Sequence, residues 1–149
     1  MTTSRARERP DVQVLTEIGI IAQLSGAALE RSLPDGLSRA QFGVLSHFMR
    51  RGGEESPARL AAAFQVTKGA MTNTLQRLEA QGYVAIAGDS GDGRRKRVSL
   101  TPAGVKAYEA GIAAVRPHMD GLRDAFTEAE FKAAIPFLTA LRIWLDDNR

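Results

Sequence analysis

The sequence predicts a mostly helical α+β domain, in which long terminal helices flank a central unit of short helices and a β-hairpin. Apolar residues recur at three- and four-residue steps through most of the chain, as they do in amphipathic helices. Between residues 83 and 101 the apolar period changes to two, which is typical of strands. The 149 residues, 44% of them hydrophobic, are enough for one domain with a sizeable core.

Two helices are expected first, over residues 11–33 and from Ser38 to about Gly52. The sequence Leu33-Pro34-Asp35-Gly36 ends the first, because proline and glycine interrupt helices. Ser38 and Gln41 have the spacing of a capping box, in which each side chain bonds a free backbone amide of the first turn. The second helix is expected to bury one set of apolar side chains: Phe42, Leu45, Phe48 and Met49.

Two short helices follow, joined by a tight turn at Gln65-Val66. Ser56 is a typical N-cap, with Pro57 at the first helical position. Thr67 caps the next helix, which is expected to run to Gln81 and to end at Gly82, since glycine commonly follows the last helical residue.

A hairpin and two further helices complete the predicted fold. The strands YVAIA and RVSLT are expected to be joined by nine residues, 88–96. Thr101-Pro102 begins a helix that Pro117 is expected to kink. Thr127 and Glu130 form a second capping box. The helix that they begin carries large apolar residues on one side: Phe131, Ile135, Leu138, Leu141, Trp144 and Leu145.

Two short helices joined by a turn, with a hairpin after the second, describe a helix-turn-helix with a wing. On the second of these helices, Met71, Leu75 and Leu78 share one side and are expected to be buried. The outward side is expected to carry small, amide, hydroxyl or cationic side chains and no carboxylate.

These outward side chains have the chemistry that reads DNA. Asn73 and Gln76 can bond adenine bidentately, Arg77 can bind guanine or a phosphate, and the methyl group of Thr72 can contact a thymine methyl. Four residues near the starts of the two short helices are candidates for close backbone approach or phosphate contact: Ser56, Arg59, Lys68 and Gly69. For any one outward residue, an ordinary solvated position is the better explanation, but a complete side without carboxylates favours DNA contact.

The hairpin tip is strongly cationic, because Arg94, Arg95, Lys96 and Arg97 follow the glycine-rich stretch GDSGDG. A tip beside a recognition helix lies over the neighbouring minor groove, where arginine is favoured by the negative potential. Asp92 is close enough in sequence to hold the guanidinium of Arg94 in place. Residues 50–97 contain nine cations and five anions, and such a localised positive region suits nucleic acid.

Several classes of function are disfavoured by what the sequence lacks. Without cysteine it has no disulfide, thiolate zinc site or cysteine nucleophile. His47 is expected to be either exposed or near a cleft, with exposure favoured, and His118 to lie at the surface. Two histidines without a matched carboxylate pattern do not make a metal site, so neither a metal nor another cofactor is predicted. No HExxH, GxSxG or phosphate-binding glycine loop is present, which argues against an enzyme. No signal peptide or membrane-spanning run is apparent, so a cytoplasmic location is expected.

The chain resembles the MarR family of winged-helix transcriptional regulators over nearly its whole length. The resemblance rests on VTKGAMTNTLQRLEAQGYV (66–84) and DSGDGRRKRVSLTPAG (89–104). The second stretch matches the wing pattern of the family, although Ser90-Gly91 and Gly93 depart from its common form. The resemblance implies that Asp92 and Arg94 are the wing pair whose arginine enters the minor groove. It also implies that residues 68–77 lie in the major groove.

The resemblance further implies one domain over 1–149, with a DNA-binding region at 36–104 and dimerisation helices at 10–35 and 105–149. A member of this family is expected to act as a homodimeric repressor on a pseudo-palindromic operator and to respond to a small aromatic or anionic effector. The many large apolar residues of the terminal helices favour a dimer independently, although some of them must pack within one chain. The alternative is a winged-helix module that binds protein rather than DNA.

Overall fold

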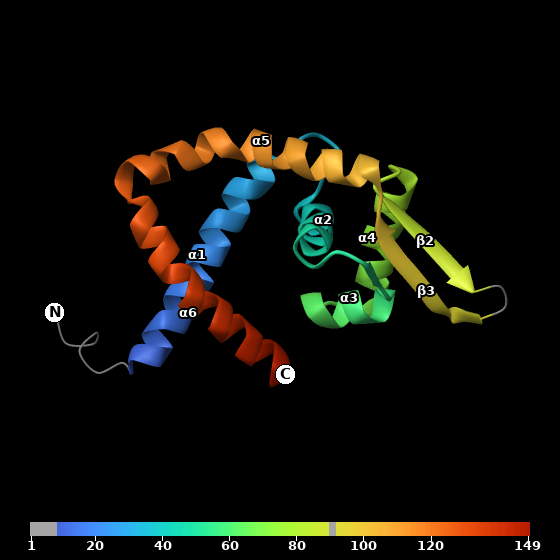
Figure 1. The fold of residues 1–149 in the computed structure, drawn as a ribbon, viewed down its shortest axis with the longest axis horizontal. Coiled ribbons are helices and arrows are strands. Elements are labelled where there is room, and N and C mark those ends of the chain that lie inside the picture. The colour runs from blue at the N-terminus through green and yellow to red at the C-terminus, as the bar shows by residue number, and fades with distance from the viewer. Residues whose placement is uncertain (1–8, 90–91) are drawn as a thin grey trace.

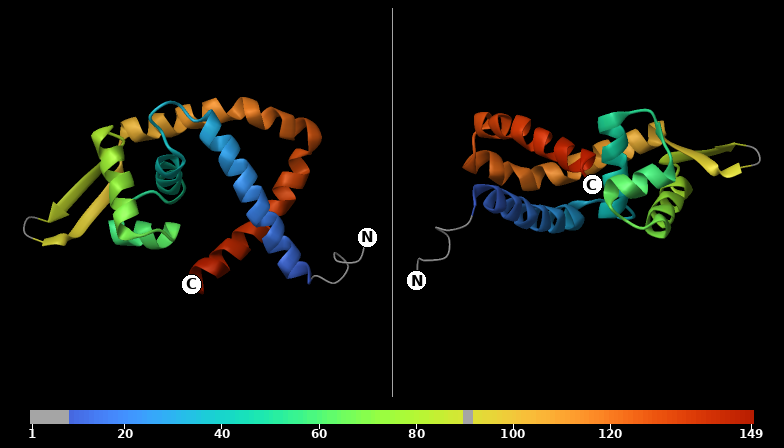
Figure 2. Two further views of the ribbon diagram at one scale, coloured as in Figure 1. Left: turned by 180° about the vertical axis from the view of Figure 1, so that it is seen from behind. Right: turned by 90° about the horizontal axis from the view of Figure 1, so that it is seen from below.

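The computed structural model describes residues 9–89 and 92–149, with the backbone alone at 89 and 92–95. Three long helices form an open frame on one side of the molecule (Figure 1): α1 (Pro10–Ser32), α5 (Pro102–Ala125) and α6 (Glu128–Asp147). The other side is a lobe of three shorter helices: α2 (Arg39–Arg51), α3 (Pro57–Phe64) and α4 (Lys68–Ala80). A hairpin projects from this lobe, away from the frame (Figure 2). The predicted α+β class, with its helix-turn-helix and wing, is confirmed.

The capping residues place the helix starts where the sequence predicts them. Ser38 Oγ accepts a hydrogen bond from the backbone N–H of Gln41 at 3.1 Å, and the Gln41 side chain accepts one from the N–H of Ser38 at 2.7 Å. Ser56 and Thr67 cap α3 and α4 through their side chains, which accept the backbone N–H of Arg59 and of Ala70. Between them, Gln65 takes the left-handed conformation with φ 53°, which turns the chain sharply from one short helix into the next.

The core lies inside the winged lobe, where the apolar sides of α2, α3 and α4 meet the sheet. The sequence predicts that Met49 is buried with this core, but Met49 is 39% exposed, so that expectation is wrong. The buried apolar side chains are Leu37, Phe42, Val44, Leu45, Phe48, Leu60, Ala61, Met71, Leu75, Leu78, Val84 and Val98.

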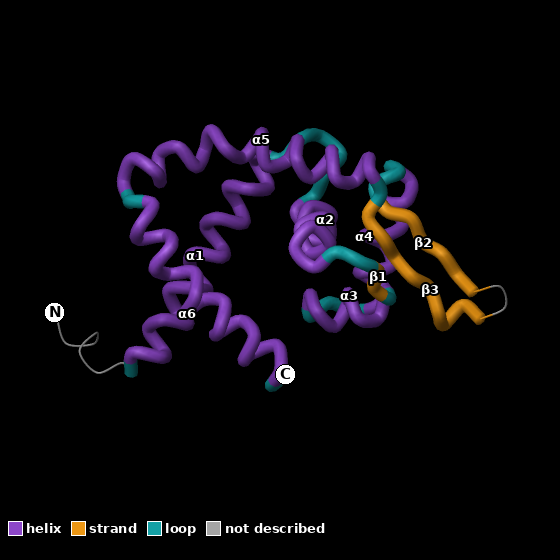
Figure 3. The backbone as a smooth tube through the Cα atoms, viewed as in Figure 1, coloured by secondary structure: helices purple, strands orange, loops and turns teal. Residues whose placement is uncertain are grey.

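The wing is longer than predicted, because its strands extend into the expected nine-residue loop. Strand β2 (Val84–Asp89) pairs antiparallel with β3 (Asp92–Leu100), with Val84 opposite Leu100 and Ile86 opposite Val98. A third strand, β1 (Glu54–Glu55), pairs with the outer side of β3 and was not predicted (Figure 3). At Val98 and Ser99, β3 is therefore paired with a strand on each side, β1 and β2.

Helix α5 is joined to the winged lobe by close contacts around Thr101. Its hydroxyl donates to the carbonyl of Gly82 at 2.6 Å and accepts from the N–H of Gly104 at 3.0 Å. A Cβ at Gly104 would clash with the carbonyl oxygen of Tyr83 and would lie 2.7 Å from Leu100 Cδ1. The absence of a side chain at Gly104 thus lets α5 begin directly against the base of the hairpin, and α5 then continues through Pro117.

The frame helices leave much apolar surface uncovered. No residue of α6 is buried, and Trp144 is 62% and Leu24 of α1 is 68% exposed. Among the described residues, α1 is also long and apolar enough to cross a membrane by length and composition. The expectation that no run approaches a span is therefore wrong for this helix. Those criteria are weak evidence by themselves, since core helices of soluble proteins also meet them.

His47 is buried, which corrects the expectation that it is exposed. Its side chain is 4% exposed, because α3 brings Phe64 over this side of α2, with ring centroids 5.6 Å apart. Burial and then the charge of Arg50 lower the pKa of His47, while Glu55 acts in the opposite direction. His118, by contrast, is exposed as expected.

We expect Gly104→Ala to destabilise the fold by about 1–3 kcal/mol, the usual cost of overpacking. The matched control is Gly121→Ala in the same helix, where a Cβ meets nothing within 4 Å. Because alanine favours helix, this control should stabilise the fold by about 0.5–1 kcal/mol. Urea unfolding followed by circular dichroism measures both. Equal effects of the two substitutions would show that the contact with Tyr83 is unimportant.

We expect stability to fall as the pH drops below 6.5, the ordinary pKa of histidine. The unfolded chain then takes up a proton that the folded chain, with its lowered His47 pKa, still resists. This loss ends below the folded-state pKa, and above pH 6.5 the residue contributes no pH dependence. Unfolding of His47→Gln should show a weaker decline than wild type, whereas His118→Gln should follow wild type. Parallel curves for wild type and His47→Gln would contradict the assignment.

Candidate nucleic-acid interface

The outward side of α4 is set by the packing of its opposite side. Met71, Leu75 and Leu78 are 3%, 2% and 0% exposed, so they fix the rotation of the helix on the core. The polar residues singled out from the sequence are all exposed: Lys68, Gly69, Thr72, Asn73, Gln76 and Arg77. The inward-outward division predicted for this helix is therefore present in the structure.

The end of α4 is held by a hydrogen-bond chain that sequence reasoning missed. The Gln41 side chain, besides closing its capping box, donates to the Gln81 side chain at 3.0 Å. Gln81 in turn donates to the carbonyl of Gly36 in the α1–α2 loop. The capping-box motif identified Gln41 but gave no signal of this contact, since Gln81 lies 40 residues further along the chain.

A hollow of about 690 Å³ separates α4 from the hairpin. Lys68, Thr72 and Gln76 line it from α4, Ser56 from the start of α3, and Lys96 from β3. Ser56 Oγ is already engaged, because it accepts the N–H of Arg59 at 3.2 Å. The structure thus brings the polar side chains of α4 and one hairpin cation, Lys96, to one concave surface.

Glu79 also lines this hollow, so the expectation of a carboxylate-free outward side is wrong for the last turn of α4. Its position is two turns beyond Thr72, on the side that faces the hairpin rather than the side of Asn73 and Arg77. Because seven residues make about two helical turns, a helical wheel also places Glu79 on the side of Thr72. Glu79 therefore adds a negative charge to the hollow that Lys96 and Gln76 also line.

Two of the remaining predicted residues lie away from the hollow. Arg97 is exposed and is 3.3 Å from Glu54 of β1 through Nη1 and Oε2. Arg59 lines a different hollow, together with Glu55 and Arg149. The side chains of Asp92, Arg94 and Arg95 lie outside the described residues, although their backbone belongs to β3.

No cluster of three or more histidine, aspartate or glutamate side chains suited to a metal ion occurs in the described part of the chain. The candidate interface on α4 and the hairpin offers exposed amides, hydroxyls and cations. Such groups can bond base edges and phosphates.

Together, the short helix pair, the exposed polar side of α4 and the hairpin define a winged helix-turn-helix DNA-binding protein. A model of the MarR family matches residues 35–95. The chain is thus similar to the MarR family of transcriptional regulators, whose members are generally not enzymes.

Similar proteins support this assignment over most of the chain. The HTH-type transcriptional regulator PecS of Dickeya dadantii is 29% identical over 135 residues, which are 83% of this chain and 79% of PecS. The structure of Bordetella bronchiseptica BpsR, whose DNA binding is regulated by 6-hydroxynicotinic acid, is 25% identical with a TM-score of 0.68, covering 87% and 98% of the two chains. A MarR-family regulator from Rhodococcus sp. RHA1 shares the fold with a TM-score of 0.72 at 15% identity, covering 91% and 97%.

We expect Glu79→Gln to strengthen binding to duplex DNA. Removing a carboxylate beside the phosphate backbone relieves repulsion worth about 0.2–1 kcal/mol, the range for exposed charge pairs, or roughly up to fivefold in affinity. Fluorescence anisotropy with a labelled duplex measures the change. Glu109→Gln, an exposed carboxylate on α5, is the matched control and should leave affinity unchanged. Weaker binding by Glu79→Gln would mean that Glu79 positions a neighbouring side chain instead.

Proposed function

We propose that this chain is a homodimeric transcriptional repressor that binds a pseudo-palindromic DNA operator and is released by a small-molecule effector. The observation that carries the proposal is the shared exposure of the polar side of α4 and of Lys96 and Arg97 on the hairpin, on the lobe opposite the apolar frame helices. Within one domain, residues 36–104 then bind DNA, and residues 10–35 and 105–149 form the dimer.

In this proposal α4 lies in the major groove. Asn73 and Gln76 read base edges there, Thr72 contacts a thymine methyl, and Arg77 binds guanine or phosphate. Other residues contact the backbone or permit its close approach: Ser56, Arg59, Lys68, Gly69, Arg95, Lys96 and Arg97. Arg94, supported by Asp92, enters the adjoining minor groove.

The uncovered apolar surface of the frame supports the dimer. A twofold dimer through α1, α5 and α6 presents two copies of α4 to half-sites about one helical turn apart. Members of the MarR family bind DNA as dimers. The regulated DNA binding of BpsR supports an effector for this chain also, and action on DNA in a bacterial type of regulator fits a cytoplasmic location.

The alternative, a winged helix that binds protein instead of DNA, makes a different prediction about salt. A DNA complex releases counterions, so its affinity falls with salt with a log–log slope of about −0.9 per phosphate neutralised. Anisotropy with a duplex selected from a random pool measures this slope. No saturable binding to any selected duplex would support the alternative.

We expect Arg94→Ala to weaken binding to the selected duplex by about 1–3 kcal/mol, because a buried groove contact is lost. Its melting temperature should stay close to that of wild type, since Arg94 lies at the hairpin tip. Arg116→Ala, an exposed arginine on α5, is the control for loss of one positive charge and should retain affinity. Equal losses of binding and of melting temperature would show that Arg94 has a structural role.

A further inference from the structure

Helix α3 lies between two hollows, one beside α4 and the other toward the frame. Residues 56–58 line the hollow beside α4 and the hairpin. Arg59, Ala62 and Ala63 line a hollow of about 400 Å³ together with residues at the ends of α2 and α6. The two hollows share no lining residue. One short helix therefore separates the surface beside α4 from a second concave surface.

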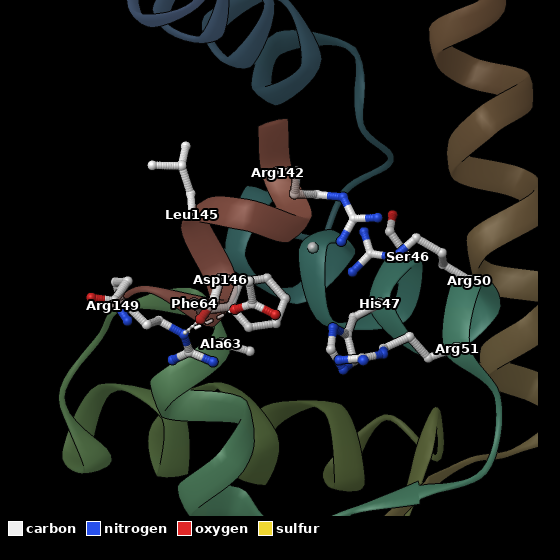
Figure 4. Close-up of a pocket in the computed structure, with 12 residues that line it drawn as sticks. Ser46, His47, Arg50, Arg51, Ala63, Phe64, Arg142, Leu145, Asp146 and Arg149 are labelled. Atoms are coloured by element: carbon white, nitrogen blue, oxygen red, sulfur yellow. Dashed lines mark hydrogen bonds and ion pairs between the residues drawn. The ribbon is translucent and has the colours of Figure 1, made fainter. Parts of the chain in front are cut away.

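The second hollow has an excess of positive charge. Arginines from three places in the chain line it: Arg51 at the end of α2, Arg59 in α3 and Arg149 just after α6. One carboxylate, Glu55, lines it with them, but its side chain is 19% exposed and lies 3.8 Å from His47, between Oε2 and Nε2. Figure 4 shows Arg51 and Arg149 on opposite sides of the adjoining cavity, which His47 also lines. We call these three arginines the arginine surface.

Two members of the arginine surface are free to bind an anion. Arg51 and Arg59 are exposed, and neither forms an ion pair within residues 9–89 and 92–149. Arg149, by contrast, pairs with Asp146 at 2.9 Å between Nε and Oδ1 and donates to the carbonyl of Ala62. These contacts hold Arg149 at the edge of the hollow, next to two unpaired guanidinium groups.

The chemistry of the hollow suits phosphate groups on an extended chain. Guanidinium groups bind phosphate in a planar, bidentate manner, and like charges gathered on one surface attract a polyanion. The other lining residues are small: Gly52, Ala62 and Ala63. They offer no large apolar side chain that could hold the body of an organic ligand. The arginines also come from separate elements, so they can contact successive phosphates rather than one small anion.

The arginine surface lies on the same face of the molecule as the candidate interface. Seen from below, the end of α6 lies beside α3, and α4 and the hairpin follow on the other side of α3 (Figure 2). The hairpin projects away from the frame, whereas the arginine surface includes a residue at the end of the frame. In a dimer formed through the frame, the arginine surface is therefore nearer to the partner subunit than α4 is.

The dimensions of a helix and of DNA fit this arrangement. An α-helix with its side chains is about 10–12 Å across, and base pairs are about 3.4 Å apart along the duplex. Crossing α3 from one hollow to the other thus corresponds to roughly three base pairs. Half-sites one helical turn apart have centres about five base pairs from the twofold axis. The arginine surface then meets the segment between the half-sites.

We propose that Arg51, Arg59 and Arg149 bind backbone phosphates of the DNA segment between the two half-sites. This inference rests on the proposed function as a dimer on a pseudo-palindromic operator. Phosphate contacts position a protein on DNA without reading bases. The arginine surface therefore adds affinity and favours one spacing of the half-sites, but it does not select the sequence of the central base pairs.

Fluorescence anisotropy of Arg51→Gln with the selected duplex, measured over a range of salt concentrations, tests the contact. Binding should weaken by about threefold or more, because each dimer loses two charged contacts. The log–log salt slope should become less steep by about 1.8, which is about 0.9 for each of two phosphates. Arg123→Gln at the end of α5, which lines neither hollow, is the matched control and should keep the affinity and slope of wild type.

Duplexes with neutral methylphosphonate linkages show where on the DNA the contact lies. Such linkages between the half-sites should weaken the binding of wild type about as much as Arg51→Gln does. They should weaken that variant little further, because one contact can be lost only once. The same linkages at the outer ends of the duplex should affect both proteins equally. Additive losses at the centre would place the contact of Arg51 elsewhere and overturn the inference.

Arg51→Lys separates loss of charge from loss of structure. Lysine keeps one positive charge, so this variant should keep the salt slope of wild type. Both variants should melt close to wild type, since Arg51 is exposed and unpaired. If lysine lost as much affinity as glutamine, or if binding and melting temperature fell together, Arg51 would have a structural role and the inference would be wrong.

Two further outcomes separate this inference from the proposed function. If wild type binds the selected duplex and Arg51→Gln equals it in affinity and salt slope, the arginine surface does not contact DNA, and the proposed function stands. If wild type binds no selected duplex, the proposed function and this inference fail together.

Discussion

The orientation of α4 on the core is the constraint on which the DNA-binding surface depends. Met71, Leu75 and Leu78 occupy one side of the helix and are almost completely buried, and rotating them outward would expose most of the apolar surface that the helix covers. Burial of each such side chain is worth about 1.5–3 kcal/mol. This exceeds the energy of a typical polar contact on the outward side, so the core decides which residues of α4 face outward.

The position of the hairpin relative to α4 depends on a junction of a few residues. The carbonyl of Gly82, which ends α4, and the N–H of Gly104, which begins α5, both bond the hydroxyl of Thr101. The side chain of Thr101 therefore joins the end of α4, the base of the hairpin and the first turn of α5. The Gln41–Gln81–Gly36 chain attaches the same end of α4 to the α1–α2 loop, so the end of α4 is held at two places.

The sequence predicted the elements whose signals are local. The caps at Ser38, Ser56, Thr67, Thr101 and Thr127 all accept the expected backbone hydrogen bond, because an N-cap depends on residues only three positions apart. The residues that face outward from α4 were predictable for the same reason. The periodicity that buries Leu75 also fixes where Gln76 points.

What could not be predicted depends on contacts between distant segments. The two-residue strand β1 forms because its backbone pairs with the edge of β3. The hairpin strands are longer than predicted because β2 and β3 form hydrogen bonds with each other. His47 lies opposite Phe42 on an isolated helix but is covered once α3 places Phe64 over it. The cavity that His47 lines is also bounded by α6. No sequence motif in α3 or α6 indicates that these two helices contribute to one cavity.

The exposed apolar surface of the frame connects these observations to assembly. Five large apolar residues of α1 are exposed (Val12, Leu15, Ile20, Ile21 and Leu24), and patches of this kind mark surfaces that bind another protein or a membrane. A bilayer would place Glu17 among hydrocarbon, which is costly for a carboxylate. A partner subunit can cover the apolar residues and leave Glu17 in water. The same helix that satisfies the length and composition of a membrane span is thus suited to the dimer interface that we propose.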